Sequence, residues 1–193
     1  MAIKKSELYS TLWKCCDELR GGMDASQYKD YVLVILFVKY ISDKSRSDHG
    51  FDIEIPEGCY FEDFVALKGT PNIGEEINKK MQALAEANGL EGVFVADFDN
   101  DDKLGKGKDK VETLSELIGV FQNENLDFSK NRAADDDLIG DAYEYLMKNF
   151  ASESGKSKGQ FYTPAEVSRV MAKVIGLNNA KNGKRTTIYD PTC

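Results

Sequence analysis

The strongest constraint on the fold is a helical spacing of apolar residues that recurs through residues 1–150. Apolar side chains follow one another at intervals of three and four in several segments, which is the spacing of one face of an α-helix. The first such segment begins after Ser6 and ends at Gly21 and Gly22. Its apolar residues are Leu8, Leu12, Cys15, Cys16 and Leu19. We therefore expect a mainly helical body.

The second segment is more apolar than the first. Asp24 and Gln27 have the spacing of an N-cap pair, and the pattern then continues to about Ile41. An apolar run of this kind also fits a buried strand, but its length favours a buried helix. Residues 43–72 carry several glycines and prolines, which predicts loops and short irregular pieces.

Three further amphipathic helices are predicted before residue 151. The first carries Ile73, Ile77, Met81 and Leu84 and stops near Gly89. The second carries Leu114, Leu117, Ile118 and Phe121. The third carries Leu138, Ala142, Tyr145, Leu146 and Phe150, and the acidic residues 135–137 before it suit a helix amino terminus.

The composition changes after residue 150. Residues 151–160 are mostly small and polar, which indicates a linker. Thr163 is a suitable N-cap, Pro164 suits the first helical position, and Glu166 completes a capping box. The apolar face of this helix consists of Val167, Val170, Met171, Val174 and Ile175, and Gly176 ends it.

A short strand is predicted at residues 186–190, before Pro191. A helix followed by such a strand is half of an α/β nucleotide-binding unit, in which ligands bind beyond the carboxyl ends of the strands. The parallel neighbours that the strand needs are missing, so we expect a truncated domain. The predicted organisation is a helical domain at residues 1–150, a linker at 151–160 and the start of a second domain at 161–193.

Charge is distributed unevenly along the chain. The formal charge is −8, with 30 acidic and 18 basic residues in residues 1–150 against 3 and 7 in residues 151–193. An acidic body is repelled by DNA phosphates. Residues 1–150 are therefore not expected to bind nucleic acid by themselves.

Several other kinds of site are disfavoured. His49 is the single histidine, the four cysteines lack paired metal spacing, and residues 99–102 resemble a calcium loop only loosely, so we expect no metal site. Gly155, Lys156 and Ser157 would belong to a phosphate loop only with glycine at position 150, which is Phe150. The longest apolar run, residues 31–38, is too short to cross a bilayer, and no signal peptide is visible. We expect a cytoplasmic protein.

Two segments near the end of the chain carry a family resemblance. Residues 159–164 read GQFYTP, and residues 188–193 read IYDPTC. Six earlier segments match the same family, in the order in which the family has them. They are residues 12–13, 19–21, 23–26, 28–30, 39–43 and 138–146. The chain resembles the amino-terminal part of the M (modification) subunit of type I restriction–modification DNA methyltransferases.

The resemblance implies an enzyme that uses S-adenosyl-L-methionine to methylate N6 of adenine in DNA. Its implied fold is a helical domain followed by the first helix and strand of a Rossmann-like α/β methyltransferase domain. The cofactor-binding positions it implies are Gln160, Phe161, Tyr162, Thr163, Pro164 and Asp190. A hydroxyl and free N–H groups at a helix amino terminus suit a carboxylate. Ala165 departs from the arginine that is common at that position in the family.

The family's catalytic motif, Asn-Pro-Pro-(Tyr/Phe), does not occur in these residues. We therefore expect the catalytic residues to lie beyond Cys193, and we expect no methyl transfer by this chain alone. The resemblance implies a specificity (S) subunit, a second M subunit, a restriction (R) subunit and, through the complex, double-stranded DNA as partners. The alternative is a helical assembly module that packs on the S subunit and DNA without binding cofactor.

Overall fold

The computed structural model describes residues 5–18, 25–47, 51–123, 126–130, 138–153, 163 and 165–176. All regular elements in these residues are helical, so the prediction of a mainly α fold is confirmed. The strand predicted at residues 186–190 lies outside them. The elements are α1 (Lys5–Glu18), α2 (Ala25–Ser47), α3 (Phe61–Val65), α4 (Ile73–Asn88), α5 (Asp101–Leu104), α6 (Lys108–Phe121), the 3-10 helix η1 (Phe128–Lys130), α7 (Leu138–Glu153) and α8 (Ala165–Ile175).

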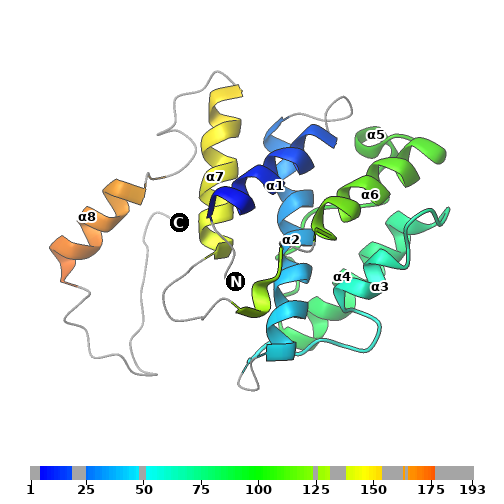
Figure 1. The fold of residues 1–193 in the computed structure, drawn as a ribbon, viewed down its shortest axis with the longest axis horizontal. Helices are drawn as coiled ribbons and strands as arrows, with labels where there is room; N and C mark the ends of the chain where they lie inside the picture. The colour runs from blue at the N-terminus through cyan, green and yellow to red at the C-terminus, as the bar shows by residue number, and fades with distance from the viewer. Residues whose placement is uncertain are drawn as a thin grey trace.

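Helix α2 is the central element of the helical body (Figure 1). It contacts α1, α3, α6, α7 and η1. Val32, Ile35, Leu36 and Val38 are fully buried, because a helix that is apolar on several sides needs neighbours on each of them. The strand alternative for this segment is wrong.

Helix α2 continues to Ser47, six residues beyond the predicted end at Ile41. Polar residues continue it because their side chains have partners in the folded protein. Ser42 is fully buried, and its Oγ donates a hydrogen bond to the carbonyl oxygen of Val38 at 2.7 Å. The prediction of a loop from residue 43 is therefore wrong for residues 43–47. Within residues 51–72 it is confirmed, apart from the five-residue helix α3.

The other predicted helices of the body are confirmed. Helix α4 ends where Gly89 takes a left-handed conformation, with φ at +63°, and its N–H bonds to the oxygen of Ala85. Helix α7 continues to Glu153, three residues into the segment predicted as a linker. The four-residue helix α5 has no apolar periodicity and was not predicted. It begins where the side chain of Asn100 accepts hydrogen bonds from the N–H groups of Asp102 and Lys103.

One hydrophobic core joins helices α1 to α7 and η1. It runs from Leu8 in α1 to Leu146 in α7. Among the described residues of α8, none belongs to this core. Within the described part of the chain, no helix is long and apolar enough to span a membrane.

Candidate functional site

Thr163 is the one predicted cofactor-binding residue that the structure describes. It is exposed and lies two residues before α8. Gln160, Phe161, Tyr162, Pro164 and Asp190 lie outside the described residues. Their assignment therefore stays a prediction.

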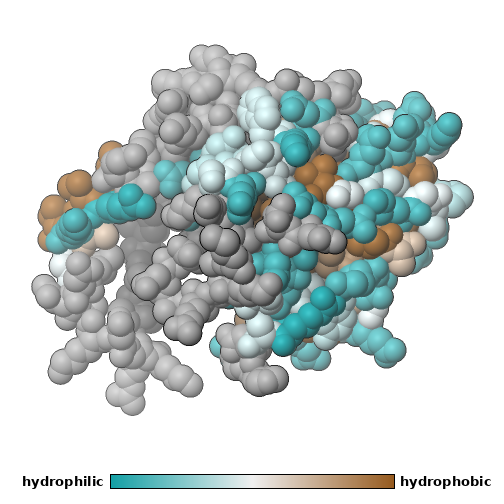
Figure 2. Space-filling model, viewed as in Figure 1, coloured by the Kyte–Doolittle hydropathy of each residue, from teal (hydrophilic) through white to brown (hydrophobic). Residues whose placement is uncertain are grey.

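Helix α8 presents an apolar face to solvent. Val170 is 61% exposed, Val174 is 81% exposed and Ile175 is 72% exposed, and Figure 2 shows brown apolar surface over this helix at the left edge of the molecule. Gly176, with φ at +77°, ends the helix where the sequence predicts. A helix of 11 residues with such a face is marginal in water by itself. Its stability in a larger protein requires a covering layer.

Two of the acidic residues that resemble a calcium loop, Asp99 and Asp101, form ion pairs with the ammonium group of Lys110. Lys110 is largely buried, and its Nζ lies 2.5 Å from Oδ1 of Asp99 and 2.9 Å from Oδ1 of Asp101. The hydrogen bonds to Asp99 and Asp101 raise the pKa of the Lys110 ammonium group. In the described part of the chain, no group of three His, Cys, Asp or Glu side chains is arranged to hold a metal ion.

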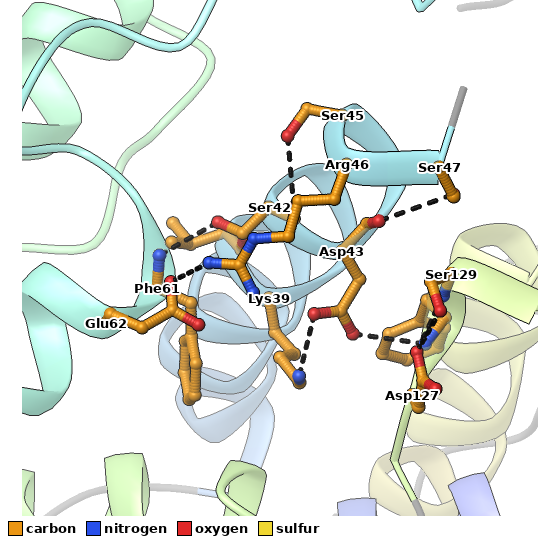
Figure 3. A network of polar contacts seen from close by, with 12 residues as sticks. Lys39, Ser42, Asp43, Ser45, Arg46, Ser47, Phe61, Glu62, Asp127 and Ser129 are labelled. Atoms are coloured by element: carbon orange, nitrogen blue, oxygen red, sulfur yellow. Dashed lines mark hydrogen bonds and ion pairs between the residues drawn. The ribbon is translucent and has the colours of Figure 1, made fainter. Parts of the chain in front are cut away.

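A buried polar junction surrounds the end of α2 (Figure 3). The carboxylate of Asp43 accepts hydrogen bonds from Nζ of Lys39 at 2.8 Å and from the N–H of Phe128 at 3.0 Å. The hydroxyl of Ser42 accepts one from the N–H of Phe61 at 2.8 Å. These bonds tie α2 to α3 and η1.

This junction explains part of the family resemblance in structural terms. Lys39, Ser42 and Asp43 from the matching segment 39–43 belong to it, and their polar atoms bond to protein atoms. In the sequence, the sign of this junction was the polar pair Ser42 and Asp43, which continues the spacing of the buried face of α2. It indicates a structural role and not a catalytic one.

An apolar groove of about 620 Å³ opens between α2, α7 and the loop after α4. Its lining residues are Asp30, Leu33, Val34, Phe37, Ile53, Leu90, Val93, Phe94, Val95, Ile139, Gly140 and Tyr143. Sequence reasoning missed it because four segments far apart in the chain line it, among them the loop before α3 through Ile53. The available signal was the short apolar run of Val93, Phe94 and Val95, which lies in a segment for which no helix or strand was predicted.

Two family models match the chain. The model described as the HsdM N-terminal domain matches residues 8–121, from Leu8 in α1 to the end of α6. The model described as N-6 DNA Methylase matches residues 134–193, which includes α7, α8 and the predicted cofactor segment.

Curated relatives are methylase subunits of type I restriction enzymes. The type I restriction enzyme MpnII methylase subunit of Mycoplasma pneumoniae is 26% identical over 94% of this chain and 41% of its own length. The MjaVII methylase subunit of Methanocaldococcus jannaschii is 30% identical over 98% of this chain and 34% of its own length. The chain thus spans less than half the length of these relatives.

A solved structure has the same fold. The type I restriction-modification system methyltransferase subunit from Streptococcus thermophilus matches with a TM-score of 0.68 and 24% identity, over 91% of this chain and 45% of that one. The family models together extend from the first helix to the last residue. The chain therefore belongs to the HsdM family, the methylase subunits of type I restriction enzymes.

Proposed function

We propose that the chain is the amino-terminal part of a DNA methylase subunit that, with its S subunit, transfers a methyl group from S-adenosyl-L-methionine to N6 of adenine. The observation that carries this proposal is the N-6 DNA Methylase match over residues 134–193, which contains the GQFYTP and IYDPTC segments. S-adenosyl-L-methionine supplies the methyl group. The chain's own contribution is to bind and orient it.

The proposed binding segment is Gln160, Phe161, Tyr162, Thr163 and Pro164, together with Asp190. The exposed position of Thr163 ahead of α8 supports this role, because N–H groups in the first turn of a helix have no partner within it and favour a carboxylate. In the proposal, Phe161 forms an apolar wall and Asp190 opens the turn beside the cofactor. The catalytic Asn-Pro-Pro-(Tyr/Phe) motif is outside these 193 residues, so methyl transfer needs more than this chain.

The proposed domains are residues 1–150, a linker at 151–160, whose first three residues are the last turn of α7, and the start of a Rossmann-like domain at 161–193. Contacts of α7 with α1 and α2 support placing α7 in the helical domain. The exposed apolar face of α8 supports a second domain, since a sheet that begins with the strand at residues 186–190 would cover it.

Cofactor titration tests the proposed binding segment. S-adenosyl-L-methionine is titrated into the full-length subunit, its Phe161→Ala, Thr163→Ala double variant and a Ser168→Ala control, which removes an exposed hydroxyl from α8. We expect the double variant to lose about tenfold or more in affinity and the control to stay within about twofold of the wild type. Equal affinities would remove residues 160–164 from the site.

A second function is favoured by the acidic helical body with its single core. In this proposal residues 1–150 are an assembly module that packs on the S subunit and a second M subunit and closes over DNA, without itself binding cofactor. Co-purification with the S subunit tests it. If residues 1–150 neither retain the S subunit nor support assembly of the complex, the assembly function is excluded.

A further inference from the structure

We propose that the apolar groove between α2, α7 and residues 90–95 binds an amphipathic helix of a partner polypeptide, whose apolar face is flanked by lysine or arginine. The proposal goes beyond methyl transfer and does not depend on it. It rests on the chemistry of the groove, on the exposure of its rim and on the charge around it.

The groove lacks the groups that a small-molecule site needs. Sites for small ligands combine apolar walls with several convergent polar groups that fix orientation. Asp30 is the one charged side chain among the lining residues, and Nζ of Lys29 already lies 2.5 Å from its Oδ1. An extended apolar surface without such groups suits the apolar face of a helix, which recognises grooves through side chains spaced three and four apart.

The rim of the groove is exposed and apolar. Val95 is 73% exposed, Val93 is 61% exposed and Tyr143 is 45% exposed. Val93 and Val95 come from the loop after α4 and Tyr143 from α7, so apolar surface lies on two separate elements around one depression. Apolar side chains that gather at a depression mark interaction surfaces more often than scattered ones do.

The groove is preformed. The ring of Phe37 on α2 lies 5.5 Å from the ring of Phe94 in the loop. The loop is itself held by hydrogen bonds from the N–H of Leu90 to the oxygen of Ala85 and from the N–H of Val93 to the oxygen of Leu90. A partner helix would therefore bind without first ordering this surface.

Charge selects the kind of partner. The segments that line the groove, residues 29–37, 51–55, 90–97 and 138–146, carry seven carboxylates and one amine, that of Lys29. Of the seven carboxylates, that of Asp30 lines the groove itself. Two copies of this chain that met through the groove would bring like charges together, which disfavours association. A partner helix with basic residues beside its apolar face would bury the apolar surface of the groove and attract the acidic residues around it.

A display library tests the proposal with the whole 193-residue chain as bait. Its members are helical peptides of about 18 residues with one fixed leucine stripe and with Lys or Glu randomised at every flanking position. Binding of the most enriched peptide is then measured by fluorescence anisotropy. The variants are Val93→Lys, Val95→Lys and Glu91→Lys, and Val170→Lys on α8 is the control, since it makes the same change at an exposed valine away from the groove.

We expect Lys-flanked peptides to be enriched, the groove variants to weaken binding by about tenfold or more, and the α8 control to change it by less than about twofold. The proposal would be overturned if Glu-flanked peptides were enriched or if no peptide were enriched. It would also be overturned if the enriched peptide bound the Val93→Lys and Val95→Lys variants as tightly as the wild type. Stronger binding to the Val170→Lys variant would also overturn it, because α8 would then be the occupant. Dimerisation of the wild type that Val95→Lys abolishes would assign the groove to a second copy instead.

Discussion

Gly74 lies at a point where α4 meets the backbone of a later loop. A Cβ atom at this position would be 2.2 Å from the carbonyl oxygen of Phe98 and 2.8 Å from its carbonyl carbon. Neither atom belongs to a flexible side chain, so backbone would have to move. The amphipathic pattern of α4 predicts the helix but not this close approach, because the approach depends on a residue 24 positions away.

We expect Gly74→Ala to lower the free energy of unfolding by about 2 kcal/mol through overpacking. The matched control is Gly119→Ala in α6, where the new Cβ would meet only the Nζ of Lys68 at 3.2 Å. In that control, the free energy of unfolding should stay the same or rise by up to about 1 kcal/mol, because alanine has a higher helix propensity than glycine. Urea unfolding of the three proteins measures both values, and a Gly74→Ala variant as stable as the wild type would contradict the packing described here.

Tyr31 gives the fold a pH dependence in the alkaline range. Its side chain is buried, and its hydroxyl donates a hydrogen bond to the oxygen of Asp97 at 3.1 Å. Burial, with smaller effects of the Asp97 and Asp30 carboxylates, raises the pKa of Tyr31 from 10.0 to about 12. Between these two values the unfolded chain loses the proton while the folded protein keeps it, so stability falls as pH rises.

The measurement is the free energy of unfolding of the wild type and Tyr31→Phe as a function of pH. Below a pH of about 10 the wild type should be more stable by about 1 kcal/mol through its hydrogen bond. This advantage should shrink as pH rises to about 12. Parallel pH profiles of the two proteins would show that Tyr31 does not titrate as described.

At the scale of elements, regular apolar spacing predicted α1, α4, α6, α7 and α8 because each has one face that must be buried or covered. It failed where tertiary contacts decide the structure. Helix α2 runs past Ile41 because Ser42 and Asp43 find partners on α3 and η1, and those partners lie 19 and 85 residues away in the chain. No local pattern contains that information.

Asp43 is the residue on which the junction of α2 with η1 depends. We expect Asp43→Ala to cost about 3 kcal/mol, because it leaves the partly buried Lys39 ammonium and the N–H of Phe128 without their acceptor. Glu62→Ala is the control, since its ion pair with Arg46 is exposed and should contribute at most about 1 kcal/mol. Thermal or urea unfolding distinguishes them. Similar losses in the two variants would mean that the junction contributes no more than a surface ion pair.

Helix α7 is matched by the N-6 DNA Methylase model but packs on the helical body. The ring of Tyr145 on α7 stacks on that of Tyr9 on α1, with centroids 4.3 Å apart and planes 5° from parallel. A double-mutant cycle with Tyr9→Leu and Tyr145→Leu should give a coupling of about 1 kcal/mol. A coupling near zero would separate α7 from the helical domain and shift the proposed boundary to a position before residue 138.

Across the whole molecule, the sequence predicts the cofactor segment, whereas the structure describes the helical body. The cofactor segment was predicted from motif residues, and of these the structure describes Thr163 alone. The helical body and its apolar groove come from the structure, because a surface built from distant segments has no local sequence signature. The structure thus describes the acidic helical domain, and the methyl-donor pocket after it belongs to the proposed function.

Methyl transfer to DNA is the direct test of the proposed function. The full-length subunit that contains these residues is combined with its S subunit, unmethylated DNA and S-adenosyl-L-methionine with a labelled methyl group, and the labelled base is identified. We expect label on N6 of adenine, a methyl-transfer rate about tenfold or more lower in the Phe161→Ala, Thr163→Ala variant, and little change of that rate in Ser168→Ala. Label on another base, or full activity in the double variant, would contradict the proposed function.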